Sequence, residues 1–134
     1  MLKFRGYISS RALNDGSITD QSIQNLVIRT ACEKRKFNYM LSATEYGMKN
    51  SYLMLNQVLS ELKKKKFDGI AFYSIDQLPT NQNLRNKIYN IAKKYNIKIL
   101  LSLEGIILSK KKEIEEFENL FKIRKYLKYS PKVI

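Results

Sequence analysis

The fold is decided by the stretch DGIAFYSIDQLPTNQNLRNKIYNIAKKYNIKILLSL, which spans residues 68–103. Its two ends, 68–75 and 97–103, are short and apolar, which is typical of buried strands. Between them Pro79 signals a turn, and residues 82–95 repeat apolar side chains at helical spacing. Two strands joined by one helix form a right-handed parallel crossover, so this stretch predicts an α/β fold.

The alternation of strands and helices extends in both directions from this stretch. In chain order we expect strands at 4–9 and 38–44 with helices at 19–36 and 50–65 before it, and a short strand at 106–108 and a helix at about 109–128 after it. This order predicts a three-layer α/β/α sandwich of flavodoxin-like class, with a mostly parallel sheet of four to five strands. A length of 134 residues fits one domain over residues 1–134.

All four expected helices have apolar stripes, which we expect to face the core. In the helix at 19–36 the stripe consists of Ile23, Leu26, Val27, Thr30 and Ala31. In the last helix it consists of Ile114, Phe117, Leu120 and Phe121. With Ile123 added, the face of the last helix is wider than one contact with a sheet needs, and it predicts a homodimer through this helix.

Composition excludes several classes of chemistry. The chain has no His and one Cys, so the usual zinc sites, His-based triads and an internal disulfide are excluded. No carboxylate cluster indicates a metal and no motif identifies a cofactor. No apolar run approaches the ~20 residues that span a bilayer, so we expect no membrane partner. The start lacks a signal-peptide core, and with the single Cys32 this favours a cytoplasmic location.

The formal net charge of +13 has two interpretations. It is compatible with a polyanion partner. However, only six of the 25 basic residues are Arg, and Lys, Asn and Ile are abundant, as an AT-rich genome would encode whatever the function. Both interpretations predict salt-sensitive, non-specific binding of nucleic acid.

Polar side chains follow four of the expected strands, with Glu104 after the strand at 97–103. In open parallel sheets, ligands bind beyond the carboxyl ends of the strands, where the strand order reverses. The candidate site residues at these ends are Ser9, Ser10, Arg11, Thr44, Glu45, Ser74, Asp76 and Gln77. Such a set suits a polar, hydroxyl-rich or phosphorylated ligand, although no Gly-rich phosphate loop is present.

The residue types indicate a role for each candidate. Arg11 is the expected anion clamp, and the hydroxyls and Gln77 are expected to bond sugar hydroxyls or phosphate oxygens. Glu45 or Asp76 is the candidate catalytic base if catalysis occurs. The structural alternatives are a plain polar loop for Ser9 to Arg11, a surface position for Glu45, and a turn-capping bond from Asp76.

Three segments resemble serine recombinases of the resolvase type. GYISSR at 6–11 resembles the family's G-Y-x-R-x-S opening, IDQLPT at 75–80 resembles L-D-R-L-x-R, and LSLEGI at 101–106 resembles S-L-x-E-G-I. The order and spacing agree across about residues 4–106. The resemblance implies a resolvase-type catalytic-domain fold.

The same resemblance implies that the recombinase reaction is lost. The family's first arginine falls on Ser9 and its nucleophilic serine on Arg11, while its two later arginines fall on Gln77 and Thr80. Only the aspartate, Asp76, is retained. Phosphodiester transfer needs an activated hydroxyl and cationic stabilisation of the developing charge.

A second resemblance covers more of the chain. The bacterial "sporadic carbohydrate cluster" family is similar to this sequence in FRGYISSR at 4–11, QNLVIR at 24–29, LSATEY at 41–46, YLML at 52–55 and YSIDQLP at 73–79. It implies a role in making a surface polysaccharide or an activated sugar, with a sugar or nucleotide-sugar as ligand.

Three functions stay open at this point. The first is an enzyme or accessory factor that binds a sugar or nucleotide-sugar. The second is a non-catalytic resolvase-like module that binds nucleic acid. The third is a scaffold subunit of a carbohydrate-assembly complex, for which the last helix would be the docking face.

Overall fold

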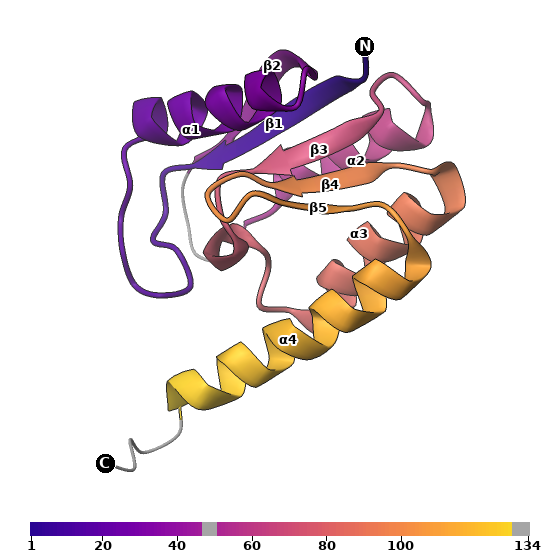
Figure 1. The fold of residues 1–134 in the computed structure, drawn as a ribbon. Coiled ribbons are helices and arrows are strands. Elements are labelled where there is room, and N and C mark those ends of the chain that lie inside the picture. The colour runs from indigo at the N-terminus through magenta and orange to yellow at the C-terminus, as the bar shows by residue number, and fades with distance from the viewer. Residues whose placement is uncertain (47–50, 130–134) are drawn as a thin grey trace.

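The computed structural model describes residues 1–46 and 51–129, which form a five-stranded sheet with helices on both faces (Figure 1). The elements in chain order are β1 (Lys3–Ser9), α1 (Gln21–Lys34), β2 (Asn38–Glu45), α2 (Leu53–Lys63), β3 (Gly69–Phe72), the 3₁₀ helix η1 (Ile75–Gln77), α3 (Gln82–Tyr95), β4 (Lys98–Leu101), β5 (Ile106–Leu108) and α4 (Lys111–Tyr129). Each expected element is present, and η1 is an addition.

The strand order in the sheet is β2-β1-β3-β4-β5. Strands β1 to β4 are parallel, and β5 runs antiparallel to β4. The chain passes from β1 outward to β2 and then returns to β3 on the other side of β1, so the order reverses between β1 and β3. The predicted α/β fold with a mostly parallel sheet is confirmed.

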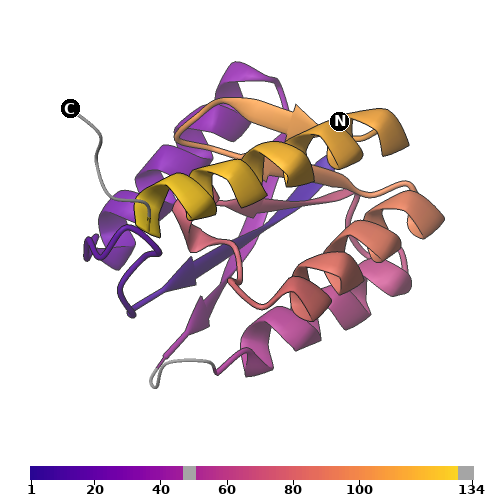
Figure 2. The same cartoon turned by 90° about the horizontal axis from the view of Figure 1, so that it is seen from below.

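Helices cover the two faces of the sheet (Figures 1 and 2), and an apolar core lies on each face. The larger core contains buried side chains of α2, α3 and α4, among them Leu59, Ile88 and Phe117. The smaller core joins Ile28 and Cys32 of α1 to the other face. Helices on both faces make the three-layer arrangement that the strand and helix order predicts.

The expected stripe of α1 is wrong in part: Val27 and Ala31 pack against the core, but Ile23, Leu26 and Thr30 are exposed. The buried residues of α1 are Gln24, Ile28 and Cys32, whereas Ile23 is 47% and Leu26 is 61% exposed. The physical reason is a hydrogen-bonding demand that apolar periodicity does not report. The Gln24 amide bonds both the N–H and the C=O of Ser9, so the helix turns this amide inward and turns Leu26 outward.

The expected stripe of α4 is right in part. Ile114, Phe117 and Phe121 are buried, but Leu120 is 62% and Ile123 is 55% exposed. A buried ion pair accompanies this orientation, because Glu118 accepts hydrogen bonds of 3.0 and 2.9 Å from Arg85 of α3. Because the Arg85–Glu118 pair is largely buried, it favours the rotation of α4 about its axis that turns Glu118 toward α3.

Candidate functional site

The candidate residues lie at the carboxyl edge of the sheet, on both sides of the point where the strand order reverses. Ser9 ends β1 and pairs with Glu45, which ends β2. On the other side of β1, the chain leaves β3 at Phe72 and enters η1, which carries Asp76 and Gln77. Because β1 lies between β2 and β3, Ser9 is the centre of the arrangement.

The first group of side chains is organised around Arg11. Its guanidinium donates a hydrogen bond of 2.7 Å to the Tyr7 hydroxyl and a second bond to the carbonyl of Ser51. It also stacks on the ring of Tyr52, with 4.2 Å between the guanidinium carbon and the ring centroid. All three contacts are with neutral groups, and no described residue forms an ion pair with Arg11.

Glu45 is buried beside this group, with 3% of its surface exposed, so a surface position is wrong for this residue. Its Oε1 atom accepts from the Tyr7 hydroxyl at 3.1 Å, and its Oε2 atom accepts from the backbone N–H of Met54 at 2.8 Å. Met54 lies in the first turn of α2, where a carboxylate is favoured by the helix dipole. Glu45 therefore caps α2 from outside the helix.

Tyr7 connects the cation to the carboxylate. Its hydroxyl accepts from Arg11 and donates to Glu45. Burial raises the pKa of Tyr7 far above its ordinary value, although the charge of Arg11 opposes this shift. The phenol therefore remains protonated at neutral pH and holds Arg11 in place as a neutral partner.

The second group is a buried network of amides. Gln77 donates to Gln24 Oε1 at 2.8 Å and to Ser9 Oγ at 3.5 Å. Its own Oε1 accepts from the N–H of Tyr73 at 2.7 Å. These bonds use the amide of Gln77 inside the protein, so the structure assigns Gln77 a bonding role between β1, α1 and η1.

Ser74 and Asp76 lie at the start of η1. The Ser74 hydroxyl accepts from the N–H of Asp76 at 2.9 Å, so Ser74 is the residue that caps this turn. The Asp76 carboxylate instead accepts from Arg124 of α4 at 2.6 Å. This ion pair connects the candidate site to the last helix.

The remaining two candidates lie at the rim. Ser10 is exposed, and its N–H donates to the carbonyl of Glu45 at 3.1 Å. Thr44 is half-buried and pairs with Ile8 in the sheet. The structure thus brings Ser9, Ser10, Arg11 and Glu45 together, and Gln77 contacts them through Ser9.

Four residues that contribute to the candidate site were not predicted from the sequence: Tyr7 as a hydrogen-bonding residue, Gln24, Tyr52 and Arg124. A signal existed for Gln24, because it shares an i, i+4, i+8 spacing with Ile28 and Cys32. Arg124 gave no signal, because its partner Asp76 is 48 residues away in the chain.

Neither metal nor thiol chemistry is indicated. Within residues 1–46 and 51–129, no group of three or more His, Cys, Asp or Glu side chains is placed to hold a metal ion. Cys32 is buried, and burial raises the pKa of its thiol to about 11, so the nucleophilic thiolate is scarce at neutral pH.

Within residues 1–46 and 51–129, no helix is both long and apolar enough to cross a membrane.

No protein-family model and no curated protein sequence matches this chain. Six chains of solved structures match it in fold, among them the following two. A resolvase family site-specific recombinase from Streptococcus pneumoniae has a TM-score of 0.67 and 13% identity, covering 92% of this chain and 89% of that chain. The N-terminal catalytic domain of TP901-1 integrase has a TM-score of 0.63 and 16% identity, covering 93% of this chain and 99% of that chain.

These likenesses confirm the expected resolvase-like fold. At such low identity they concern the fold alone. The resemblance to the "sporadic carbohydrate cluster" family has no matching family model or curated protein behind it and stays a prediction.

Proposed function

We propose that this resolvase-like domain is a cytoplasmic binding domain of surface-carbohydrate biosynthesis. It takes a small anionic, hydroxyl-rich ligand, of the sugar-phosphate or nucleotide-sugar kind, at the carboxyl edge of its sheet. The observation that carries the proposal is the state of Arg11, a half-buried cation that neutral groups orient and that forms no ion pair with a described carboxylate, the nearby Glu45 being separated from it by the Tyr7 hydroxyl.

Arg11 is the half-buried one among the described arginines without an ion pair, since Arg29 and Arg35 also have none but are exposed. Arg5, Arg85 and Arg124 each form an ion pair with a carboxylate. A guanidinium that is already stacked and hydrogen-bonded loses little conformational freedom when it binds, and its planar fork fits phosphate or carboxylate oxygens. Arg11 therefore combines an available charge with a preset orientation.

Exposed groups at this edge of the sheet favour a hydroxyl-bearing ligand. Ser10 is exposed next to Arg11, and the ring of Tyr46, which follows Glu45, is exposed as well. Hydroxyls bond sugar hydroxyls, and an exposed aromatic ring can stack on a nucleobase. Ser9, Thr44, Ser74 and Gln77 complete the proposed site as supporting residues.

Of the two candidate bases, Asp76 is held by fewer of the described hydrogen bonds. The oxygens of Glu45 are held by Tyr7 and by backbone N–H groups of α2, and moving them would uncap that helix. Asp76 is held by the single side chain of Arg124. If the domain is catalytic, we assign Asp76 the role of general base.

A panel of nucleoside diphosphate sugars, with the free nucleotides and neutral sugars as controls, tests the proposal by thermal shift. A ligand that binds the folded state raises the free energy of unfolding by RT ln(1 + [L]/Kd), so Tm rises with the ligand concentration. We expect stabilisation by an anionic member of the panel and none by the neutral sugars. A panel without effect at millimolar concentration would contradict the proposal.

The same proposal excludes DNA strand exchange. Arg11 stands where the recombinase resemblance places the nucleophilic serine, and Gln77, buried in an amide network, stands where it places an arginine. We expect no covalent protein–DNA adduct on nicked or intact duplex. An adduct through any serine would contradict this.

A second candidate function is a non-catalytic nucleic-acid-binding module. The fold likeness to recombinases favours it. Binding that is confined to polyanions and falls steeply with salt would support this candidate over the first.

A further inference from the structure

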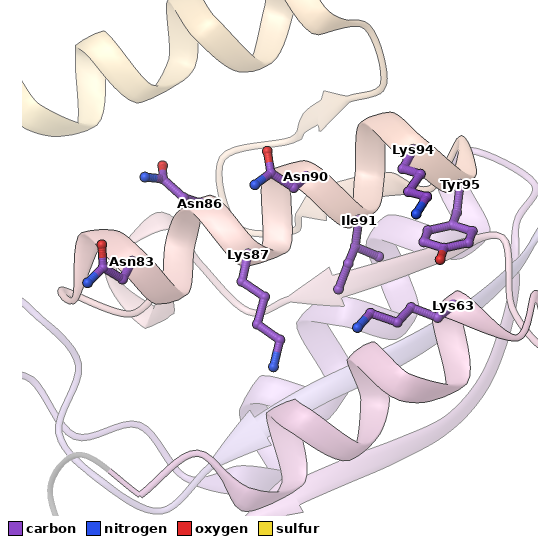
Figure 3. Close-up of a pocket in the computed structure, with 8 residues that line it drawn as sticks. All are labelled: Lys63, Asn83, Asn86, Lys87, Asn90, Ile91, Lys94 and Tyr95. Atoms are coloured by element: carbon purple, nitrogen blue, oxygen red, sulfur yellow. The ribbon is translucent and has the colours of Figure 1, made fainter.

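We infer that a groove between α2 and α3 binds an anionic polysaccharide chain. The groove has a volume of about 400 Å³, and six polar residues line it: Lys63 of α2, and Asn83, Asn86, Lys87, Asn90 and Lys94 of α3 (Figure 3). None of them belongs to the Arg11 site, so the inference is independent of the proposed function.

The charge of the groove is uncompensated. The chain has no Asp or Glu between Asp76 and Glu104, so α3 contains no acidic residue. The one acid of α2, Glu61, is paired with Arg5. The lysines of the groove therefore have no described carboxylate partner, and their combined field attracts a negatively charged ligand.

Amides and ammonium groups alternate along the groove. Asn83, Lys87, Asn90 and Lys94 follow one another at i, i+4, i+7 and i+11, which places all four on one side of α3. Lys87 and Lys94 are about 10 Å apart along the helix axis, from the rise of the α-helix. This linear alternation fits an extended chain better than a compact molecule.

The lysines are directed by contacts of their own. Lys87 donates to Asn56 of α2 at 3.1 Å, and the ammonium of Lys94 lies 5.4 Å from the ring centroid of Tyr95. Figure 3 shows Lys87 and Lys63 extending into the space between the two helices from α3 and α2. Charge is thus concentrated in the groove.

The residue types favour a sugar polymer over a nucleic acid. An asparagine amide both donates and accepts, which matches sugar hydroxyls, and an ammonium pairs with a carboxylate as a point charge. Sites for single-stranded nucleic acids add aromatic stacking platforms, and often Arg, to the Lys groups that contact phosphates. The groove lining contains no Arg, and its one aromatic ring, that of Tyr95, is half-buried and already contacted by Lys94.

The probe for the test is an oligogalacturonate, a polymer of acidic sugars, with dextran as the neutral control. Its affinity is measured by calorimetry on the full chain at about 150 mM salt, where long-range charge effects are screened. The double variant Lys87→Ala with Lys94→Ala removes two exposed ion pairs between the groove and the probe, each worth up to about 1 kcal/mol. We expect it to lower the affinity for the probe about tenfold or more. The matched control, Lys111→Ala with Lys112→Ala, removes the same charge from the start of α4 and is expected to change it less than about twofold.

A second pair of variants holds the net charge constant. Asn86→Ala with Asn90→Ala is expected to lower the affinity several-fold, whereas Asn119→Ala, an exposed position on α4, is expected to leave it unchanged. Alanine is the better helix former, so these variants keep the helix intact.

The inference is overturned if oligogalacturonate does not bind, or if the control lysines weaken binding as much as the groove lysines do. It is also overturned if single-stranded RNA or duplex DNA binds more tightly while the Asn variants have no effect. That result would identify a general polyanion surface.

Discussion

The guanidinium of Arg11 donates a 2.7 Å hydrogen bond to the hydroxyl of Tyr7, a buried core residue at the centre of the sheet edge. The orientation of the cation is thus tied to the core. The proposed anion clamp is then a fixed part of the fold, and changes at Tyr7 are expected to reach ligand binding through Arg11.

Tyr7→Phe tests this connection. Removal of the hydroxyl frees Arg11 from one of its partners, so we expect a several-fold loss of affinity for an anionic ligand and about 1 kcal/mol less stability. The matched control is Tyr89→Phe, which removes another buried hydroxyl that bonds a glutamate, here Glu118. We expect Tyr89→Phe to lose about as much stability as Tyr7→Phe and to keep the wild-type affinity for the anionic ligand. Equal affinity losses in both variants would contradict the role of Tyr7.

The rotation of α1 predicts two opposite mutational effects. Ile28 is fully buried, so Ile28→Ala is expected to destabilise the protein by about 2–4 kcal/mol through the cavity it leaves. Leu26 is mostly exposed, so Leu26→Ala is expected to stay within about 0.5 kcal/mol. Urea unfolding of both variants measures this difference. A larger loss for Leu26→Ala than for Ile28→Ala would show that the apolar stripe faces inward after all.

Acid sensitivity is expected from Glu118. Burial raises its pKa, but hydrogen bonds from Arg85 and Tyr89 outweigh burial, and the pKa is lowered below its ordinary value of 4.5. A pKa that is lower in the folded state stabilises the protein above the ordinary value, and this stabilisation is lost as the pH falls through the folded-state pKa. The stability difference between wild type and Glu118→Gln should therefore shrink below about pH 4.5. A difference that stays constant from pH 7 to pH 3 in urea unfolding would contradict it.

Self-association is expected through α4. Leu120 and Ile123 are exposed on it, and they are what remains of the wider apolar face that the sequence predicts. We expect a dimer by light scattering at roughly 100 μM, and a monomer for Leu120→Lys with Ile123→Lys. A monomeric wild type at that concentration would limit any association to weaker than about −5 to −6 kcal/mol and would contradict the prediction.

Local signals were sufficient to predict the strands and the α-helices, though not η1. The apolar strands around α3, Pro79 and the helical spacing of α2 and α3 each lie within one segment, so the strand and helix order, and hence the parallel sheet, follow from the sequence. The inward turn of Gln24 depends on Ser9 and Gln77, the latter 53 residues away. Periodicity within a helix carries no information about such partners.

The candidate site shows the same limit. Topology placed the correct strand ends together, because the carboxyl ends of parallel strands share one edge. The partners of each side chain were not predictable, since Glu45 caps a helix that begins after it and Asp76 binds Arg124 across the molecule. Residue type indicated what Arg11 can bind, and only the three-dimensional contacts show that its charge has no described ion-pair partner.

The central claim is that Arg11 binds the anionic part of a sugar ligand, and calorimetric titration of an Arg11→Ala variant tests it most directly. The titrant is the nucleoside diphosphate sugar that stabilises the wild type most, and the control is Arg29→Ala, which removes an exposed arginine from α1. We predict that Arg11→Ala weakens binding by roughly 1.5–3 kcal/mol, the scale of a charge-assisted hydrogen bond, while Arg29→Ala binds as the wild type does. Unchanged affinity in Arg11→Ala, or an equal loss in both variants, would contradict the account.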